Sequence, residues 1–438
     1  MSDRLLRPGP PGGFQLLQQS GTDMSVTSTD AGTRVQGRVC AGIDWAKDDH
    51  VVCVLGPDGA VVDRFSIGHT SAGLKQLLIR LLAAGAGEVG IERGDGPVVE
   101  ALLAAGLQVF VVVPSQVKNL RARYGSAGNK DDRFDAYVLA DVIRTDHRRL
   151  TPLVRSSPAT VALRATVRAR RDLVAHRIAV GNQLRSHLQL VFPAAAGLFS
   201  SIDTQTSLAF LERFTTQVQA DWLTPARFKA WLSRSGYTGS TSAEEFHRRL
   251  VSAPRGDSSA AASTYAVITL GHVAVLRTLK AQIAALAESI ADQFADHPDA
   301  PVFDSLPRSG TVRAARLLAE IGDARGLFPT ADSLACLAGV APSTRQSGKV
   351  RTVTFRWGAH RELRDAICDF AGDSRHANAW AADLYDRARA RGHDHPHAVR
   401  ILARAWVDII WRCWQDGVAY DPGRHLALQR VLAHDLAA

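Results

Sequence analysis

VCAGIDWA, residues 39–46, is the stretch that decides the fold of the N-terminal part of this chain. It is a short, β-branched run, and a second such run, HVVCVLG (50–56), follows it closely. A third run, VVDRFSIG (61–68), comes after a Pro-Asp-Gly turn. Short β-branched runs separated by turn residues predict three consecutive strands in a hairpin-rich sheet.

Helices and strands alternate after this start. SAGLKQLLIRLLAAG (71–85) is amphipathic and ends at glycine, which predicts a helix. A strand (88–93), a helix (97–105) and another strand (107–114) are expected next. The order β-β-β-α-β-α-β fits a ribonuclease H-like α/β domain, in which helices flank the sheet.

The rest of the chain is predicted to be mainly helical. Apolar residues recur at three- and four-residue steps through 161–191, and a 3-4-3-4 rhythm typical of a coiled-coil seam runs through 263–294, a candidate dimer seam. The Ser/Thr/Ala-rich stretch 195–262 shows only short helical pieces. We therefore expect a disordered tail (1–36), an α/β domain (37–155), a helical coiled-coil region (156–300) and a mainly helical C-terminal domain (301–438).

The composition limits the class of protein. With 46% hydrophobic and 22% charged residues, the chain is typical of a globular protein. No apolar run approaches the ~20 residues of a membrane helix, and the Gly/Pro-rich N-terminus lacks the apolar core of a signal peptide. Five dispersed cysteines without a CxxC pair argue against a disulfide framework and against a thiolate zinc site. We expect a cytoplasmic protein with no membrane partner.

Positive charge is concentrated in one segment. Residues 118–190 contain 15 Lys and Arg against 6 Asp and Glu, a surplus that equals the +9 of the whole chain. Basic and acidic residues cancel elsewhere. A basic excess confined to one segment favours a polyanion-binding surface, although a solvated Arg-rich helix face has the same composition.

Four carboxylates occur where divalent cations would be held. Asp44 lies inside the first apolar strand and Glu92 near the end of a later one, and a buried acid is costly unless it is paired or metal-bound. Asp132 and Asp135 are spaced i, i+3, so a helix places both on one face. Two-metal phosphodiester chemistry needs such converging carboxylates. The alternative is that each acid is a surface residue or a helix cap, a role that Asp131 and Asp132 could share.

At these residues the chain resembles a known family. GIDWAKDDH, IERGDGP and VPSQVKNLRARYGSAGNKDDRFDAYVLAD are similar to the N-terminal half of the DEDD-type insertion-sequence transposases, relatives of the Piv DNA invertase, whose N-terminal domain is RuvC-like. The segment 163–193 resembles the Arg-rich helix that follows in that family. The resemblance implies that Asp44, Glu92, Asp132 and Asp135 are metal carboxylates for Mg²⁺ or Mn²⁺, and Asp131 is assigned no such role.

The C-terminal part carries two further blocks. FDSLPRSGTVRAARLLAEIGD (303–323) is similar to a helix–hairpin–helix element, whose turn amides can contact DNA phosphates, and simple helical packing is the alternative. LACLAGVAPSTRQSGKVRTVTFRWGAHRELRDAI (334–367) favours an ordered, basic loop and closely resembles the second block of the same transposases. That resemblance implies that Ser347 is a nucleophile on DNA. A serine that hydrogen-bonds in a turn is the alternative, and Ser343 and Ser309 are fallback candidates.

The resemblance covers about 38–193 and 300–415 and implies a transposase or site-specific recombinase that cuts and rejoins the DNA of a mobile element. It further implies donor and target DNA, a structured non-coding guide RNA and a homodimer or homotetramer as partners, and a cytoplasmic protein associated with the nucleoid. The residues expected to contact nucleic acid are Arg121, Arg123, Lys130, Arg164, Arg168, Arg171, Arg345, Lys349, Arg351 and Arg356.

Three other classes of protein share some of these features. A RuvC-like junction-resolving nuclease would use the four acids with water as the nucleophile and would not need Ser347. An actin-like or sugar-kinase ATPase can also begin with GID in a strand, but no Gly-rich second phosphate loop is visible. A non-catalytic nucleic-acid-binding relic would have no reason to retain all four acids.

Overall fold

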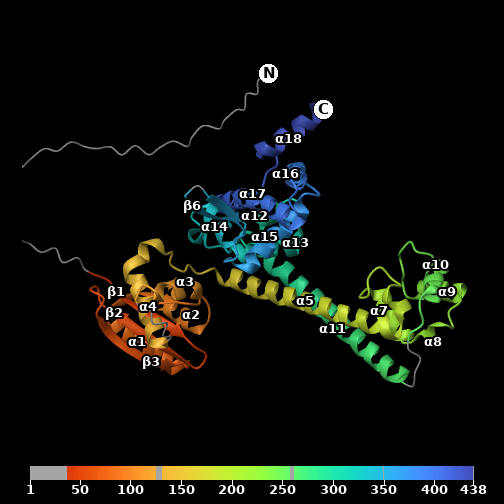
Figure 1. The fold of residues 1–438 in the computed structure, drawn as a ribbon, viewed down its shortest axis with the longest axis horizontal. Helices are drawn as coiled ribbons and strands as arrows, with labels where there is room; N and C mark the ends of the chain where they lie inside the picture. Colours follow the sequence, from red (N-terminus) through yellow and green to blue (C-terminus); the bar gives the residue numbers. More distant parts are fainter. Residues whose placement is uncertain (1–36, 125–130, 257–260, 349, 438) are drawn as a thin grey trace, which may run out of the picture. The chain divides into compact units, whose positions relative to one another are not determined.

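The computed structural model describes residues 37–124, 131–256, 261–348 and 350–437, and the predicted tail 1–36 lies outside these ranges. The chain divides into two compact units, one that ends at Leu153 and one that begins at Val154. The first corresponds to the predicted α/β domain. The second contains both the region predicted as coiled coil and the C-terminal region (Figure 1).

The first unit is built on one mixed sheet. Its strands follow the predicted β-β-β-α-β-α-β order, and the helices α3 and α4 come after the last strand. The elements are β1 (Val39–Trp45), β2 (Asp49–Leu55), β3 (Val61–Gly68), α1 (Ser71–Ala83), β4 (Ala86–Ile91), α2 (Pro97–Ala104), β5 (Gln108–Val111), α3 (Pro114–Arg121), α4 (Asp132–Asp146) and a short 3₁₀ turn (His147–Arg149).

The strand order across the sheet is β3-β2-β1-β4-β5, with β1, β2 and β3 antiparallel and β4 and β5 parallel to β1. Side chains alternate between the two faces of each strand. Ala41 and Ile43 of β1 therefore lie in the core beneath α1 and α2, whereas Cys40 is in the core beneath α4. This mixed sheet with helices on both faces is compatible with the predicted ribonuclease H/RuvC-like class.

The second unit is organised around two long antiparallel helices, α5 (Pro158–Val191) and α11 (Ala262–Ala295), which lie side by side (Figure 1). Thr166 of α5 contacts Gln293 of α11, and His187 contacts Thr269, so the two helices run in opposite directions. The predicted seam residues Leu276, Ile283 and Ile290 are buried. The heptad rhythm is therefore real, but its partner is α5 of the same chain, so this face is not free to serve as a dimer seam.

Helix α11 has one property that the sequence analysis did not anticipate. By length and composition alone it is long and apolar enough to cross a membrane. This is weak support for a membrane span, because core helices of soluble proteins meet the same criterion.

Small helices gather at the end of the long pair where α5 finishes (Figure 1). The stretch 195–262, which sequence patterns did not place, folds here around Phe210, Phe228, Trp231 and Phe246, packed against Leu188 of α5. Its helices are α6 (Pro193–Ala196), α7 (Gln205–Arg213), α8 (Gln217–Ala220), α9 (Pro225–Arg234) and α10 (Ala243–Ser252).

The C-terminal helices gather at the other end of the pair. The basic block predicted as a loop contains a two-stranded hairpin, β6 (Ser343–Ser347) and β7 (Val350–Thr354), whose residues are nearly all exposed. The remaining elements are α12 (Ala300–Asp304), α13 (Gly310–Ile321), a 3₁₀ turn (Arg325–Leu327), α14 (Ala331–Leu337), α15 (Arg361–Ser374), α16 (Ala379–Ala390), α17 (His395–Asp416) and α18 (Leu426–Ala437).

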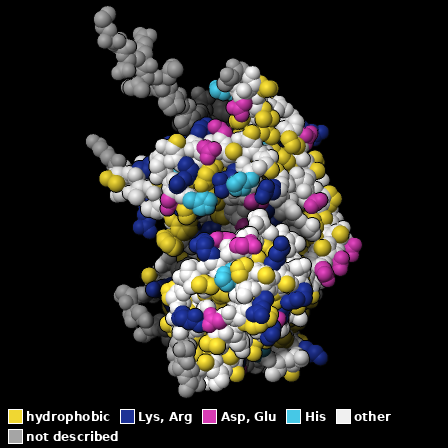
Figure 2. Space-filling model, turned by 90° about the vertical axis from the view of Figure 1, so that its right-hand side faces the viewer, with side chains coloured by type: hydrophobic (Ala, Val, Ile, Leu, Met, Phe, Trp, Pro, Cys, Tyr) yellow, Lys and Arg dark blue, Asp and Glu magenta, His cyan; other side chains and the backbone are white. Residues whose placement is uncertain are grey.

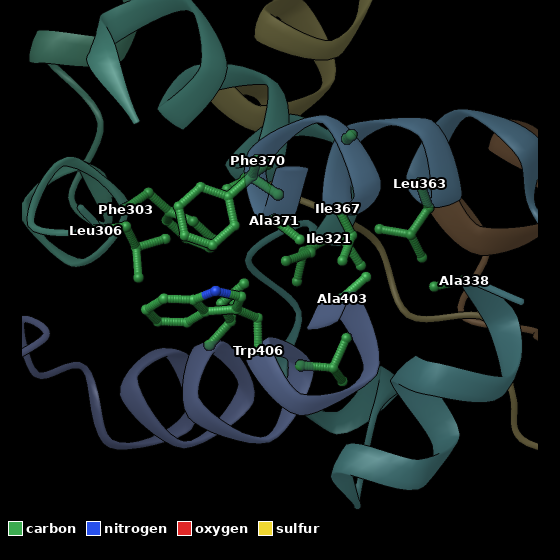
Figure 3. Packing of buried hydrophobic residues seen from close by; sticks show 14 of the residues in the cluster. Phe303, Leu306, Ile321, Ala338, Leu363, Ile367, Phe370, Ala371, Ala403 and Trp406 are labelled. Carbon is green, nitrogen blue, oxygen red and sulfur yellow. The ribbon is translucent and has the colours of Figure 1, made fainter. Parts of the chain in front are cut away.

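Trp406 of α17 is central to the C-terminal core. Its ring is fully buried, and its centroid lies 5.1 Å from that of Phe370 at a steep angle, with Phe303 and Leu306 close by (Figure 3). The indole N–H donates a hydrogen bond of 2.9 Å to Ser374 Oγ. The ring thus combines a large buried apolar surface with a satisfied polar atom, as buried tryptophans require.

Replacing Trp406 with alanine is expected to lower the free energy of unfolding of the second unit by about 3–5 kcal/mol, because the change leaves a large cavity. Urea denaturation followed by circular dichroism measures the loss. The matched control is Trp357→Ala, because Trp357 is 84% exposed and its loss should cost less than about 0.5 kcal/mol. Equal losses in the two variants would contradict this account of the core.

Candidate functional site

Two glycines allow α4 to lie directly on the sheet. A Cβ added at Gly42 of β1 would come within 2.1 Å of the Ala136 carbonyl oxygen, and one at Gly90 of β4 within 2.8 Å of the Leu139 carbonyl oxygen. Any side chain at either position would push the helix away. Asp44 lies two residues after Gly42 and so on the same face of β1, the face that α4 covers. This close packing brings the first turn of α4 to the carboxyl end of β1.

Three of the predicted acids meet at this point. Asp44, Asp132 and Asp135 each offer a carboxylate oxygen, and the three oxygens lie within 4.8 Å of one another. Asp135 is buried, Asp44 is half-buried and Asp132 is exposed, so the group opens to solvent on one side. Oxygen ligands from several carboxylates are the donor set that hard divalent cations such as Mg²⁺ prefer. The residues present therefore fit a divalent metal.

Arg121, at the end of α3, makes a two-pronged ion pair with Asp135. The Asp135 side chain is only 3% exposed, and a buried carboxylate is costly unless positive charge compensates it. Arg121 supplies that charge here, 14 residues away in the sequence. Arg121 is among the residues predicted to contact nucleic acid, and its pairing with Asp135 was not predicted. No local pattern signals an ion pair between the ends of two helices.

Asp131 and Asp132 take different roles in the structure. Asp131 is the N-cap of α4, and its carboxylate accepts a 3.1 Å hydrogen bond from the Arg133 backbone N–H. Asp132 is the first residue of the helix, and it contributes to the three-carboxylate group. Asp131 thus caps the helix and Asp132 belongs to the three-carboxylate group, and the predicted metal role of Asp132 stays a prediction.

Glu92, the fourth predicted acid, is half-buried and follows Ile91, the last residue of β4. Ile91 pairs with Ile43 of the parallel strand β1. Glu92 follows Ile91 and Asp44 follows Ile43, so both acids lie at the same end of these two strands. The metal-capable group within the described residues nevertheless consists of the three aspartates alone. A role for Glu92 stays a prediction.

The five cysteines are free, as the sequence suggested. Burial raises the pKa of the Cys40 thiol to about 12, and burial raises that of Cys368 to about 11. Both thiols therefore stay protonated at neutral pH, a state that suits neither nucleophilic attack nor metal binding.

Ser347, the predicted nucleophile, lies in the second unit at the last position of β6. It is exposed and in register with Val350 of β7, and Gly348, which follows it, has a φ of 57°. A positive φ is typical of a tight hairpin connection and is readily adopted by glycine. The Ser347 hydroxyl is thus presented near the tip of an exposed hairpin.

The two fallback serines lie in less suitable places. Ser343 is at the opposite end of β6, at the base of the hairpin, where it pairs with Thr354. Ser309 is 3% exposed, and its hydroxyl faces the Asp304 carbonyl oxygen at 3.4 Å. Only Ser347 is both exposed and next to the turn.

The arginines predicted to line α5 are held by the C-terminal part of the same unit. Arg164 donates to the Ala319 carbonyl oxygen at 2.6 Å, and burial lowers its pKa. Arg168 makes a two-pronged ion pair with the buried Glu320, at 2.7 and 2.9 Å. These contacts show a structural use of both side chains, and their predicted role toward nucleic acid stays untested.

Arg171, the third arginine of this stripe, pairs with Asp172 and with Glu362 of α15. The three arginines on this face of α5 thus bind carboxylate and carbonyl oxygens of residues far away in the sequence. The stripe is therefore already largely neutralised inside the protein.

The remaining predicted contact residues divide into four groups. Arg345 and Arg351 are exposed on the hairpin, and side-chain alternation puts Arg345 on the face of Ser347 and Arg351 on the opposite face. Arg356 donates to the Ala341 carbonyl oxygen at 3.2 Å. Arg123 is half exposed and lies 3.9 Å from Asp146. Lys130 and Lys349 lie outside the described residues.

Charged side chains of both signs are visible over the face of the molecule shown in Figure 2. Lys and Arg are interspersed with Asp and Glu and do not form one unbroken basic sheet there. This mixture agrees with the many arginine–carboxylate pairs described above.

Comparison with known proteins places these residues in a family context. Residues 41–193 match a DEDD, IS110-type family model described as transposase, and residues 300–386 match the model described as transposase of the IS116/IS110/IS902 family. A Streptomyces coelicolor protein named as the mini-circle transposase for IS117 is 33% identical over 403 residues, 89% of this chain and 97% of that protein.

Two further relatives align over nearly their whole length. The 42 kDa protein of insertion element IS900 from Mycobacterium paratuberculosis is 28% identical, over 88% of this chain and 97% of the relative. The 44.8 kDa protein of insertion element IS116 from Streptomyces clavuligerus is also 28% identical, over 88% of this chain and 96% of the relative.

Proposed function

Because this chain belongs to the IS116/IS110/IS902 family of transposases, which cut and rejoin the DNA of mobile elements, we propose that it does so with a carboxylate-held divalent cation and with Ser347 as nucleophile. The observation that carries the proposal is the meeting of Asp44, Asp132 and Asp135 within 4.8 Å. These acids come from a strand and from a helix separated by some 90 residues of sequence, and two glycines are needed to bring them together.

Asp44, Asp132 and Asp135 would hold Mg²⁺ or Mn²⁺, with Glu92 as a fourth carboxylate at the same edge of the sheet. When bound, the cation would neutralise charge that develops on the phosphodiester oxygens during cleavage. The first unit would accordingly act as a ribonuclease H/RuvC-like domain. Arg121 would compensate Asp135 until the cation does so, and it would then be available to a DNA phosphate.

Ser347 would carry the covalent step. Its hydroxyl oxygen would form a bond to the phosphorus of the scissile phosphodiester, while the bond from phosphorus to one deoxyribose oxygen breaks. The serine proton would finally reside on the released sugar hydroxyl, so no other reactant is consumed. Arg345 shares the face of Ser347 and would bind a phosphate oxygen beside it. Attack by the sugar hydroxyl of another strand would reverse the step and rejoin DNA.

The DNA partners follow from this reaction, and the guide RNA is what the family resemblance implies. Donor and target DNA would be the substrates, and a structured non-coding RNA would pair with both. Strand exchange between two duplexes calls for more than one active site, so a homodimer or homotetramer is proposed, at the nucleoid. Arg123, Arg345 and Arg351 are the exposed cations that support nucleic-acid binding best.

An in vitro recombination assay tests the proposal. The purified protein, with its co-purifying RNA recovered and sequenced, is incubated with donor and target DNA in Mg²⁺, in Mn²⁺ or in EDTA. We expect joined products with either cation and none in EDTA, because the carboxylates alone cannot neutralise a developing phosphate charge. Products that form equally well in EDTA would contradict the metal assignment, and recombination without any RNA would contradict the guide.

A further inference from the structure

A pocket lies at the base of the hairpin that carries Ser347. It has a volume of about 420 Å³ and is walled by the chain after α14, by the end of β7 with Phe355 and Arg356, and by one side of α17 with His397, Arg400 and Arg404. Pockets of roughly 300–1,000 Å³ are of the size that holds small organic ligands. The proposed chemistry at Ser347 makes no use of this pocket.

The pocket wall is positively charged. It contains three arginines and one histidine and no Asp or Glu. Arg404 is paired with Asp332 and Asp408, and Arg356 is bonded to the Ala341 carbonyl oxygen. Arg400 differs from both, because its guanidinium lies over the ring of Phe355, with the guanidinium carbon 5.0 Å from the ring centroid. Among the residues that the structure describes, the Arg400 guanidinium thus lines the pocket without a hydrogen-bonded partner.

His397 adds a neutral polar group beside Arg400. Burial lowers the pKa of His397, and His393 and Arg400 act in the same direction. Its imidazole is therefore neutral at neutral pH and offers one donor and one acceptor. A cation beside a neutral donor is suited to an anionic oxygen such as that of a phosphate.

Aromatic side chains adjoin this basic wall. Phe355 is part of the wall, and the Trp357 ring lies 4.9 Å from it, nearly perpendicular. Trp357 is 84% exposed, the highest value of any aromatic side chain among the exposed large hydrophobics of the described chain. Proteins that bind single strands stack unpaired bases on exposed aromatic rings that lie beside positive charge, and Trp357 has these features.

The hairpin fixes how far this pocket is from Ser347. Ser343 pairs with Thr354 at the base of the hairpin, and Ser347 lies four residues further along β6. At ~3.4 Å per residue, the separation is ~14 Å. That distance corresponds to roughly four nucleotides of a B-form strand, and to fewer of an unstacked one.

We propose that the pocket between the hairpin base and α17 binds one unstacked nucleotide of the DNA strand whose cleavage Ser347 carries out, with the base stacked on Trp357 and its phosphate at Arg400. The inference rests on the proposed function for the choice of DNA, because the same hairpin presents Ser347. It assigns to the pocket a role in binding and holding the strand near the cleavage point, separate from the chemistry.

The test uses the full-length protein in EDTA, so that binding is measured without cleavage. A short single-stranded oligothymidylate carrying one 5-iodouracil is irradiated in the complex, and cross-linked peptides are identified by mass spectrometry. We expect the cross-link at Trp357. Trp357→Ala should weaken binding of the strand about tenfold, as loss of one stacked base does. The matched control is Trp222→Ala, which removes a half-exposed tryptophan far from the hairpin in sequence.

Arg400→Gln tests the phosphate contact. The slope of log binding constant against log salt concentration should fall by about 0.7, the value for one phosphate contact on a single strand. Arg248→Gln on α10 removes an exposed arginine elsewhere and should leave the slope unchanged. A cross-link at another residue, or equal effects of Trp357→Ala and Trp222→Ala, would overturn the proposal.

An oligouridylate arm separates RNA from DNA. Preferential cross-linking of the RNA strand at Trp357 would overturn the assignment to DNA. Failure of the proposed function is distinguishable, because Ser347→Ala protein that cleaves nothing should still cross-link the DNA strand at Trp357. Conversely, Trp357→Ala protein should still form the covalent adduct at Ser347 when DNA is saturating.

Discussion

Ser347→Ala is expected to abolish covalent attachment of the protein to DNA and to lower the rate of strand cleavage by a factor on the order of 10⁴–10⁶, as removal of a nucleophilic serine does in enzymes that depend on one. The side chain is exposed at the end of β6, so removing its hydroxyl leaves no cavity and no unsatisfied partner. The fold should therefore be unchanged.

The measurement is a denaturing gel of labelled DNA after incubation with the protein and Mg²⁺, in which an adduct migrates with the protein. Ser343→Ala is the matched control, because Ser343 lies on the same face of the same strand, four residues away. Wild-type cleavage by Ser347→Ala protein would exclude Ser347 as the nucleophile and would favour a junction-resolving nuclease that uses water.

The second large effect is expected from Asp132→Asn, which should lower Mg²⁺-dependent cleavage by about three orders of magnitude. Charge stabilisation by a bound metal contributes several kcal/mol to catalysis, and each 1.36 kcal/mol is a factor of ten in rate. Asp132 is exposed, so the change tests the carboxylate without disturbing the core, unlike a change at the buried Asp135.

Asp131→Asn is the control for this prediction, because asparagine caps a helix as well as aspartate does. It removes the neighbouring negative charge but keeps the bond to the Arg133 N–H. Cleavage by Asp131→Asn protein should remain within about twofold of wild type, because the group that faces the metal is retained. Equal losses in both variants would mean that Asp132 acts only through general negative charge at the start of α4.

The sheet and most of the candidate metal site could be predicted because their determinants are local. Alternation of β-branched residues fixed β1, β2 and β3, and the i, i+3 spacing put Asp132 and Asp135 on one face of α4. The convergence on Asp44 depends on the close approach of α4 to Gly42, which is a tertiary contact. Glu92 comes directly after β4, the strand that pairs with β1, and its role at the metal stays a prediction.

The β6–β7 hairpin was predicted as a loop because both of its faces are exposed. A strand that buries one face leaves an alternating apolar pattern, and this hairpin has polar and basic residues on both faces instead. Ser347 was therefore identified through the family resemblance and not through periodicity. The pocket beside the hairpin could not be predicted from the sequence, because its walls come from β7 and α17, some 45 residues apart.

The residue spacing in 161–191 and 263–294 correctly predicted the helices α5 and α11. It did not show what each helix packs against. The arginine stripe of α5 meets Glu320 and the Ala319 carbonyl oxygen, about 150 residues later in the chain. The heptad face of α11 meets α5 itself. Spacing alone cannot show whether such a helix face packs within its own chain or binds another molecule, because the same residue pattern is expected in both cases.

The proposed mechanism requires Asp44, Asp132 and Asp135 to hold a divalent cation together, and cleavage of the protein backbone by bound Fe²⁺ tests this directly. Fe²⁺ with ascorbate and peroxide cuts a polypeptide beside the residues that hold the metal. We predict cuts next to Asp44 and within the first turn of α4, suppressed by excess Mg²⁺ and absent from Asp132→Asn protein. Cuts elsewhere, or an unchanged pattern in that variant, would contradict the metal centre.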